Sequence, residues 1–255
     1  MADAIAAADV GNPVRITNRG GRSPVLLLCD HASNHVPAGF GTLGLVREEL
    51  HRHIAWDPGA LGVAREMSRR LDAPLVESCI SRLIVDCNRP LDAPDLVPHL
   101  SELTNIPGNT HLSETEITER VALAHAPYHA AIEALVASRI AAGIPPILVA
   151  IHTFTPVYRG KERPWHIGII HDDDTRLAAP VIAGLQALPG LCVGINQPYS
   201  PADRVYYTLE RHKRAHGLKA VMIEIRNDLV ATEEDEKQWG KRLTRILGEI
   251  QGEVL

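Results

Sequence analysis

The sequence contains few aromatic residues, a small acidic excess of charge and no long apolar run. Its 255 residues include only two Phe, three Trp and five Tyr, and the net charge is −5. Nucleic-acid binding requires a basic face for the phosphates and aromatic rings for base stacking. No apolar stretch reaches the roughly 18 residues that a membrane-spanning helix requires. We therefore expect neither a nucleic-acid nor a membrane partner.

Cysteine is also scarce, and its positions do not suggest a disulfide framework or a metal cluster. The four cysteines are Cys29, Cys79, Cys87 and Cys192. They form no Cys-x-x-Cys pair, so we interpret them as buried free thiols in a reducing compartment. Residues 1–14 carry acidic side chains and no positively charged region before their short apolar stretch, unlike a secretory signal. We expect a soluble, cytoplasmic protein.

Several common catalytic motifs are missing. The chain has no G-x-S-x-G nucleophile elbow and no P-loop. Ser33 and Ser81 lie in no motif that would activate a hydroxyl. Cys29 and Cys87 precede polar residues, but alternation along a strand should turn their side chains into the core. Nucleophilic serine or cysteine chemistry and nucleotide-dependent chemistry are therefore not expected.

Apolar runs of strand length alternate with helix-period segments along the chain. We predict strands over residues 24–30, 75–79, 82–87, 147–152, 166–170, 192–196 and 219–226. We predict helices over residues 46–53, 59–71, 113–142, 172–188, 205–216 and 233–250. This alternation indicates an α/β fold with three α/β/α layers and a mixed, largely parallel sheet. No linker or repeat interrupts the pattern, so we expect a single domain over residues 1–255, with residues 1–20 poorly ordered.

The segment 88–111 is rich in Pro, Asp and Asn and has no periodicity. A loop of this length inside one domain is usually functional or disordered. It leads to Ser113, which with Glu116 forms a capping-box pattern at the start of the long predicted helix. Pro127 should kink or interrupt that helix, because proline lacks the amide hydrogen and its ring collides with the preceding turn.

Polar clusters stand at the ends of four predicted strands. They are the segments 30–34, 86–89, 152–153 and 224–228. In open α/β sheets the ligand crevice lies outside the carboxyl ends of the strands. The four clusters should therefore form one shared site.

Histidine is the abundant polar residue, with thirteen in the chain. His31 and His152 lie at separate strand ends, and with Asn34 as a third donor they could hold a divalent metal that keeps an open position. Glu224, on another strand, is suited to deprotonate a metal-bound water and to return the proton to a leaving amine. These residues predict a metal-dependent hydrolase.

Arginines accompany these residues and suggest an anionic substrate. Arg82, Arg89 and Arg226 supply planar donors that can bind a carboxylate or an oxyanion. His212 lies in a predicted helix before the Glu224 strand and could face the cleft as a further donor, or be a solvated helix residue. The remaining histidines are expected to be surface residues or hydrogen-bonded structural ones.

The polar segments resemble the motifs of a known family. CDHASNHVP (29–37), WDPGA (56–60), SRLIVDCNRP (81–90), AIHTF (150–154) and IEIRNDL (223–229) are similar to those of N-formylglutamate amidohydrolases. The resemblance implies the α/β fold of the zinc carboxypeptidases and aspartoacylases. It also implies hydrolysis of an N-formyl or N-acyl amino acid, such as N-formylglutamate, to a small carboxylate and the free amino acid.

The resemblance also implies roles for individual residues. His31 and Asn34 resemble the H-x-x-E metal motif of the carboxypeptidase-like group, His152 its later histidine, and Glu224 its catalytic glutamate. The expected cofactor is a divalent metal, with zinc as the expected ion. Asn34 departs from the glutamate of the wider group, so the three ligands would carry no compensating negative charge.

Two nearby acids could supply that charge. Either Asp30 or Asp57 is expected to ligate the metal or to accept a hydrogen bond from a ligating imidazole. The alternative for Asp57 is an Asx-type cap of the following helix.

Asn88 and Arg89 resemble the Asn-Arg pair that binds the substrate's α-carboxylate in that group, while Arg82 or Arg226 would support the tetrahedral intermediate. The expected partner is a small anionic N-acyl amino acid, and the assembly a monomer or small homo-oligomer. Two alternatives remain: a deacylase of another N-acyl amino acid or short peptide, and a non-catalytic binder of small carboxylates. The presence of both His152 and Glu224 favours an enzyme.

Overall fold

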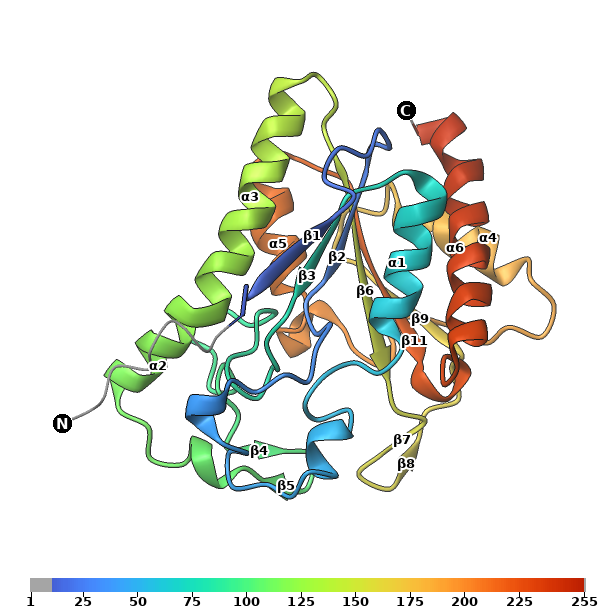
Figure 1. Cartoon of the computed structure of the whole chain (residues 1–255). Coiled ribbons are helices and arrows are strands. Elements are labelled where there is room, and N and C mark those ends of the chain that lie inside the picture. Colours follow the sequence, from blue (N-terminus) through green and yellow to red (C-terminus); the bar gives the residue numbers. More distant parts are fainter. Residues whose placement is uncertain (1–10, 255) are drawn as a thin grey trace.

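The protein has three layers, with a seven-stranded sheet between two layers of helices (Figure 1). The computed structural model describes residues 11–254, with side chains described as far as residue 250. The strand order is β1-β3-β2-β6-β11-β9-β10. The strands are β1 (Val14–Thr17), β2 (Val25–Cys29), β3 (Leu75–Ser78), β6 (Ile147–Phe154), β9 (Ile167–Ile170), β10 (Val193–Ile195) and β11 (Ala220–Arg226). The central β3, β2, β6 and β11 are parallel, β1 is antiparallel to β3, and β9 is antiparallel to β11 but parallel to β10. This pairing confirms the predicted mixed, largely parallel α/β fold.

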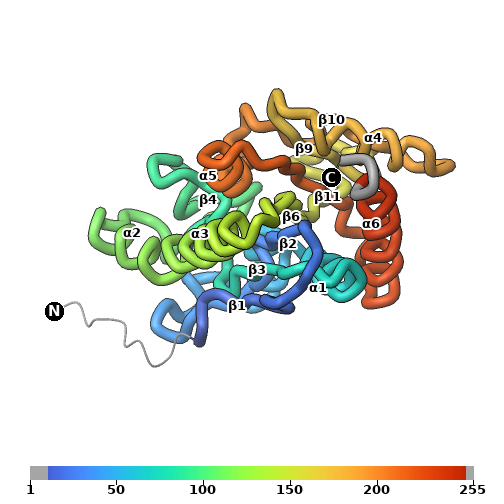
Figure 2. The backbone as a smooth tube through the Cα atoms, turned by 90° about the horizontal axis from the view of Figure 1, so that it is seen from above, coloured from blue at the N-terminus to red at the C-terminus, as the bar shows by residue number. Residues whose placement is uncertain are grey.

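Alternation along the central strands creates one apolar core on each face of the sheet. The helices are α1 (Ala60–Leu71), α3 (Ala126–Ala141), α4 (Ala178–Gln186), α5 (Tyr207–Arg214) and α6 (Glu233–Val254). In β6, Val149 and Ile151 pack in the core shared with α1, α4 and α6, whereas Leu148 and Ala150 pack on the side of α3 and α5. Figure 2 shows these two groups of helices on opposite faces of the sheet. None of the helices in residues 11–254 is long and apolar enough to cross a membrane.

The long predicted helix is interrupted, as Pro127 implies. It begins as α2 (Glu114–Arg120), capped by the Ser113 hydroxyl and the Glu116 carboxylate, and passes through a π-helical turn over Val121–His125 into α3. Pro127 lies in the first turn of α3. The wider π turn directly before it removes the strict α-helical hydrogen-bond pattern where proline would disrupt it.

Three local predictions differ from the structure. Residues 11–20 were expected to be poorly ordered, but they contain β1, which pairs with β3 at the sheet edge. The same prediction for residues 1–10, and most of the segment compared with a secretory signal, lie outside the described residues. The predicted strand 82–87 is a series of turns, because Leu83 and Val85 fill a third apolar cluster instead of joining the sheet. The predicted helix 46–53 contains only the 3₁₀ turn Glu49–His51.

The loop 88–111 is folded and packs beside the carboxyl ends of the parallel strands. It contains the short hairpin β4 (Leu100–Ser101) and β5 (Thr104–Asn105), and its Ile106 is fully buried. A second hairpin, β7 (Val157–Tyr158) and β8 (Lys161–Glu162), follows β6. The two hairpins meet where Arg159 Nη2 donates to the Glu102 carbonyl oxygen at 3.3 Å. This end of the molecule is therefore covered by segments that contact one another.

Candidate active site

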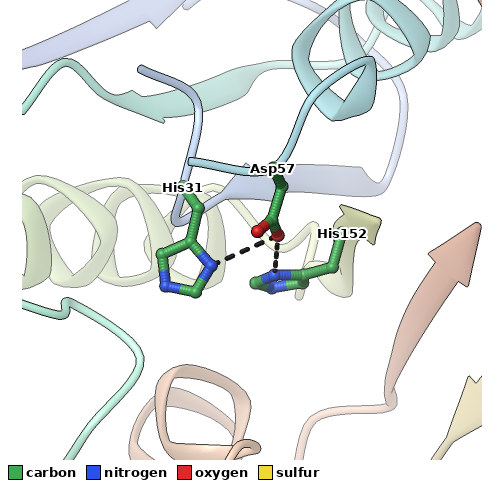
Figure 3. Close-up of side chains that lie close together, drawn as sticks. All are labelled: His31, Asp57 and His152. Atoms are coloured by element: carbon green, nitrogen blue, oxygen red, sulfur yellow. Dashed lines mark hydrogen bonds and ion pairs between the residues drawn. The ribbon is translucent and has the colours of Figure 1, made fainter. Parts of the chain in front are cut away.

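Three buried side chains from different segments converge at the carboxyl end of the sheet (Figure 3). His31 follows β2, His152 lies within β6, and Asp57 lies in the turn before α1. Asp57 Oδ2 is 3.2 Å from His31 Nδ1 and 2.8 Å from His152 Nδ1. Each residue offers one ligand atom, and these atoms lie within 4.8 Å of one another. This donor set is one that zinc uses in proteins.

Backbone contacts bring Asp57 to the two imidazoles. The Asp57 amide donates to the His31 carbonyl oxygen at 3.0 Å, and the Thr153 amide lies 3.4 Å from Asp57 Oδ2. Helix α1 is capped by Gly59, whose φ is 83°, with no side-chain hydrogen bond. The alternative interpretation of Asp57 as a side-chain helix cap is therefore wrong.

The other nitrogen of each imidazole faces a second carboxylate. His31 Nε2 is 2.7 Å from Asp86 Oδ1, and His152 Nε2 is 2.9 Å from Asp30 Oδ2. Thr208 Oγ1 donates to Asp30 Oδ1 at 2.5 Å. Such outer carboxylates fix the ring orientation of metal-binding histidines and raise their basicity. Asp30 and Asp57 both lie within hydrogen-bond distance of an imidazole, whereas the expectation that one of them ligates a metal or supports a metal-ligating imidazole stays a prediction.

The carboxylates make this group strongly favourable for a cation. Burial disfavours a charged His152, but hydrogen bonds to Asp30 and Asp57 outweigh it and hold the pKa of His152 well above its ordinary value. Burial likewise opposes ionisation of Asp57, yet the neighbouring imidazoles hold its pKa below the usual range. An environment that stabilises positive charge on the imidazoles also stabilises a bound metal cation.

Glu224 lies beside this group because of the strand register. In the parallel β6–β11 ladder Glu224 is paired with His152, and both side chains lie on the α3 and α5 face of the sheet. Glu224 is 4% exposed, and its Oε2 is buried without a hydrogen-bond partner. Burial raises the pKa of the Glu224 carboxyl to about 7, with Asp57 contributing. A carboxyl with this pKa can accept and release a proton near neutral pH.

The predicted arginines occupy different positions. Arg82 belongs to the site, since its Nη2 donates to Asp86 Oδ2 at 2.6 Å and its Nη1 lies 3.4 Å from Asp57 Oδ1. Arg226 instead forms two bonds with the Asp228 carboxylate at the end of β11, at 2.8 and 3.2 Å. Only Arg82 contacts the carboxylates around the two histidines.

The structure does not bring Asn34 to the His31 and His152 imidazoles. Its Nδ2 donates to the Leu50 carbonyl oxygen at 2.9 Å and lies 3.3 Å from His51 Nδ1. The i and i+3 positions share one face only in a helix, and residues 32–37 are not helical. Asp57 occupies the place that Asn34 was expected to take.

Asn88 and Arg89 are engaged in structural hydrogen bonds. The Asn88 side chain donates to the Val205 carbonyl oxygen and accepts from the Thr208 amide, which ties it to the start of α5. Arg89 Nε donates to Asp95 Oδ2 at 2.8 Å. Both side chains are thus held by protein partners, and their binding of a substrate stays a prediction.

His212 faces helix α3 instead of His31 and His152. Its Nε2 is 2.9 Å from His129 Nδ1, and its Nδ1 is 3.2 Å from Glu133 Oε2. His129 Nε2 in turn donates to the Cys87 carbonyl oxygen at 2.9 Å. His212 is thus part of a buried chain of histidines that joins α5 and α3 to the turn holding Asp86.

The sequence assigned no role to four residues of this region. Asp86 belongs to a polar cluster that was noticed, but its contact with His31 depends on an unpredicted turn. Thr208 carries no motif. Arg163 and Tyr199 lie in polar loops, where no periodicity indicates which side chains are buried.

Comparisons with known proteins bear on the family and the fold of the chain. A family model described as N-formylglutamate amidohydrolase matches residues 23–231. A gene product of Agrobacterium tumefaciens has a crystal structure with a TM-score of 0.93 and 43% sequence identity, covering 96% of each chain. The structure of an N-formylglutamate amidohydrolase from Ralstonia eutropha has a TM-score of 0.69 and 20% identity, covering 95% of this chain and 98% of that one, and shows the same fold. No curated protein matches the chain.

Proposed function

Because the chain belongs to the N-formylglutamate amidohydrolase family, a family of amidohydrolases, we propose that it hydrolyses N-formyl amino acids with the help of a divalent metal. The products would be formate and the free amino acid. N-formylglutamate is the substrate to test first. The observation that carries the proposal is the unpartnered, buried carboxylate oxygen of Glu224 beside the His31, Asp57 and His152 group.

The residues present fit a zinc ion. Asp57 Oδ2 lies 2.8 and 3.2 Å from the two imidazole nitrogens, close to the roughly 3.3 Å that separates ligands around tetrahedral zinc. His31, Asp57 and His152 would hold the metal, and Asp30 and Asp86 would orient the imidazoles. When bound, the metal would polarise the formyl carbonyl and lower the pKa of a water molecule.

Glu224 is the general base and acid in this proposal. Its carboxylate accepts a proton from the attacking water, so that the water oxygen forms a bond to the formyl carbon. The same carboxyl then donates that proton to the amide nitrogen as the carbon–nitrogen bond breaks. A pKa near 7 suits both transfers, because each protonation state is accessible at neutral pH.

Arg82 is the arginine best placed to support the oxyanion. It is anchored by Asp86 and keeps a side chain that is 24% exposed, so it can reach the space in front of the histidines. Arg226 pairs with Asp228 and has no comparable contact. We therefore assign stabilisation of the negative charge on the formyl oxygen to Arg82.

The test combines metal content with formate release. Purified protein is expected to hold a divalent metal and to release formate from N-formylglutamate, and chelation should abolish that activity. Glu224→Gln should keep the metal and lose about 10²- to 10⁴-fold in kcat. Asp228→Asn, outside the proposed machinery, is the matched acid-to-amide control. Full activity in Glu224→Gln would refute the role of Glu224, and full activity after complete metal removal would refute metal dependence.

A parallel screen decides the acyl group. The same protein is assayed for amine release from N-formyl, N-acetyl and N-succinyl derivatives of one amino acid. We expect the formyl derivative to have the highest kcat/KM. A clear preference for a larger acyl group would make the protein a deacylase of another N-acyl amino acid.

A further inference from the structure

Arg163, which follows the β7–β8 hairpin, is a buried arginine without an acidic partner. It is 9% exposed, and its Nη1 is buried with no hydrogen-bond partner. Among residues 11–250, no carboxylate lies within ion-pair distance of its guanidinium, whereas Arg82, whose side chain is 24% exposed, pairs with two aspartates. A buried charge without a counter-ion is costly. Such a group is retained at a cost in stability unless a ligand supplies the missing charge.

Aromatic rings hold the guanidinium in place. Its central carbon lies 4.5 Å from the centre of the Tyr158 ring, 4.8 Å from that of Tyr199 and 5.8 Å from that of Phe154. Ring faces attract a cation without using its hydrogen-bond donors. The backbone is fixed as well, because the Arg163 amide donates to the Pro156 carbonyl oxygen at 2.8 Å. The rings and the backbone therefore fix the position of the guanidinium, while its Nη1 remains without a hydrogen-bond acceptor.

The position of Arg163 relates it directly to the proposed active site. Phe154 lies two residues beyond His152 on the same face of β6, a step of about 6.6 Å along a strand. The Tyr199 ring, which also contacts the guanidinium, experiences the charge of Glu224. Burial raises the pKa of the Tyr199 hydroxyl and the charge of Glu224 raises it further, whereas the charge of Arg163 and a hydrogen bond from Arg163 lower it. Arg163 thus lies one aromatic ring away from the site of amide cleavage.

We propose that Arg163 binds a carboxylate of the amino-acid part of the substrate through its free Nη1. This assignment rests on the proposed function and replaces Arg89, which is already paired with Asp95. In an N-acyl amino acid a carboxylate is only a few bonds from the scissile amide, which matches the short step from His152 to Phe154. For N-formylglutamate the bound group is either the α-carboxylate or the side-chain carboxylate, and the two share the same chemistry.

The test compares Arg163→Met with the wild type on three substrates: N-formylglutamate, its α-amide and its side-chain amide. Loss of a hydrogen bond to a charged group should raise KM for N-formylglutamate roughly 10- to 150-fold, with a smaller change in kcat. The amide that replaces the bound carboxylate should be a poor substrate for the wild type and should be no worse for Arg163→Met. The other amide should lose as much as N-formylglutamate does, which identifies the carboxylate.

Two further variants separate binding from folding. Arg163→Lys keeps the charge but not the planar donor edge, so its KM should be intermediate. Arg19→Met, at an exposed arginine after β1, should behave as the wild type. Because an unpaired buried charge is removed, Arg163→Met should unfold at the same or a higher temperature than the wild type. A large loss of stability would indicate a structural arginine and overturn the proposal.

Calorimetric binding of free glutamate keeps this proposal distinct from the proposed function. Binding at least tenfold weaker in Arg163→Met supports the assignment even if no N-formyl substrate is hydrolysed, in which case only the proposed reaction fails. Conversely, an active wild type whose Arg163→Met variant has unchanged KM values and unchanged glutamate binding overturns the assignment of Arg163 alone. Absence of both hydrolysis and glutamate binding in the wild type overturns both.

Discussion

The buried histidine His129 should make the protein less stable as the pH falls. Burial, together with the nearby His125 and His212, lowers the pKa of His129 to about 2. Its geometry agrees with a neutral ring, because Nε2 donates to the Cys87 carbonyl oxygen and Nδ1 faces His212 Nε2 at 2.9 Å. The unfolded chain carries a histidine with an ordinary pKa of about 6.5.

The sign and size of the effect follow from proton linkage. Between pH 2 and 6.5 the unfolded state binds a proton at His129 that the folded state does not bind, so stability falls as the pH falls. Each pH unit well below 6.5 costs about 1.4 kcal/mol, and the loss between pH 7.5 and 5 is about 2 kcal/mol. His129→Gln has no such proton. The free energy of unfolding of the wild type should therefore decrease by about 2 kcal/mol more than that of the variant over this range.

Urea unfolding followed by circular dichroism, at several pH values between 7.5 and 5, measures this difference. Metal-free protein is used throughout, so that metal binding does not contribute to the pH dependence. His99→Gln is the matched control, because His99 is exposed and its curve should run parallel to that of the wild type. A His129→Gln curve that also runs parallel to the wild type would show that His129 is protonated in the folded protein and refute the reasoning.

Three further predictions concern the metal group, the position of Tyr199 and the loop 88–111. Asp57→Ala should lose the metal, whereas Asp30→Ala should bind it with an affinity about 10- to 100-fold weaker and retain it at saturating metal. Metal analysis after dialysis against graded concentrations of free zinc measures this difference. Equal retention by the two variants would show that Asp57 is no ligand. Gly168→Ala should lower kcat/KM and leave the metal content unchanged. Gly168 is paired with Glu224, and a Cβ at Gly168 would collide with the Gln197 carbonyl oxygen and displace the segment that leads to Tyr199. Unchanged kinetics would contradict this. Arg120→Met should lower the free energy of unfolding in urea by about 3 kcal/mol, since three oxygen acceptors around the loop lose their donor. A loss below about 0.5 kcal/mol would show that the loop does not depend on Arg120.

Much of the fold could be predicted from the sequence because the central strands have a simple pattern. Residues 147–152 and 219–226 are almost continuously apolar, as expected for strands covered on both faces, and both strands are present. The sequence also predicted that His31, His152 and Glu224 share one end of the sheet. That inference needs only the direction of parallel strands and no knowledge of their order.

The details of the site depend on contacts that no local pattern records. The pairing of Glu224 with His152 requires β6 and β11 to be neighbours, although about seventy residues separate them in the chain. The position of Asp57 between the imidazoles depends on a turn held by the His31 carbonyl oxygen. The strand predicted over residues 82–87 failed because an apolar run can equally fill a cluster beneath a loop. Arg163 escaped notice because burial within a polar loop has no periodicity.

The β6–β11 ladder separates the residues proposed to carry the reaction from those proposed to select the substrate. His152 and Glu224 are held by seven consecutive residue pairs between two central strands, from Leu148 and Ala220 to Phe154 and Arg226. Arg163 and the loop 88–111 lie on connections outside that ladder. Insertions or substitutions in those connections can therefore change which amino acid is accepted while the spacing of the reacting groups stays constant. Descendants of this fold could acquire new substrates without rebuilding their chemistry.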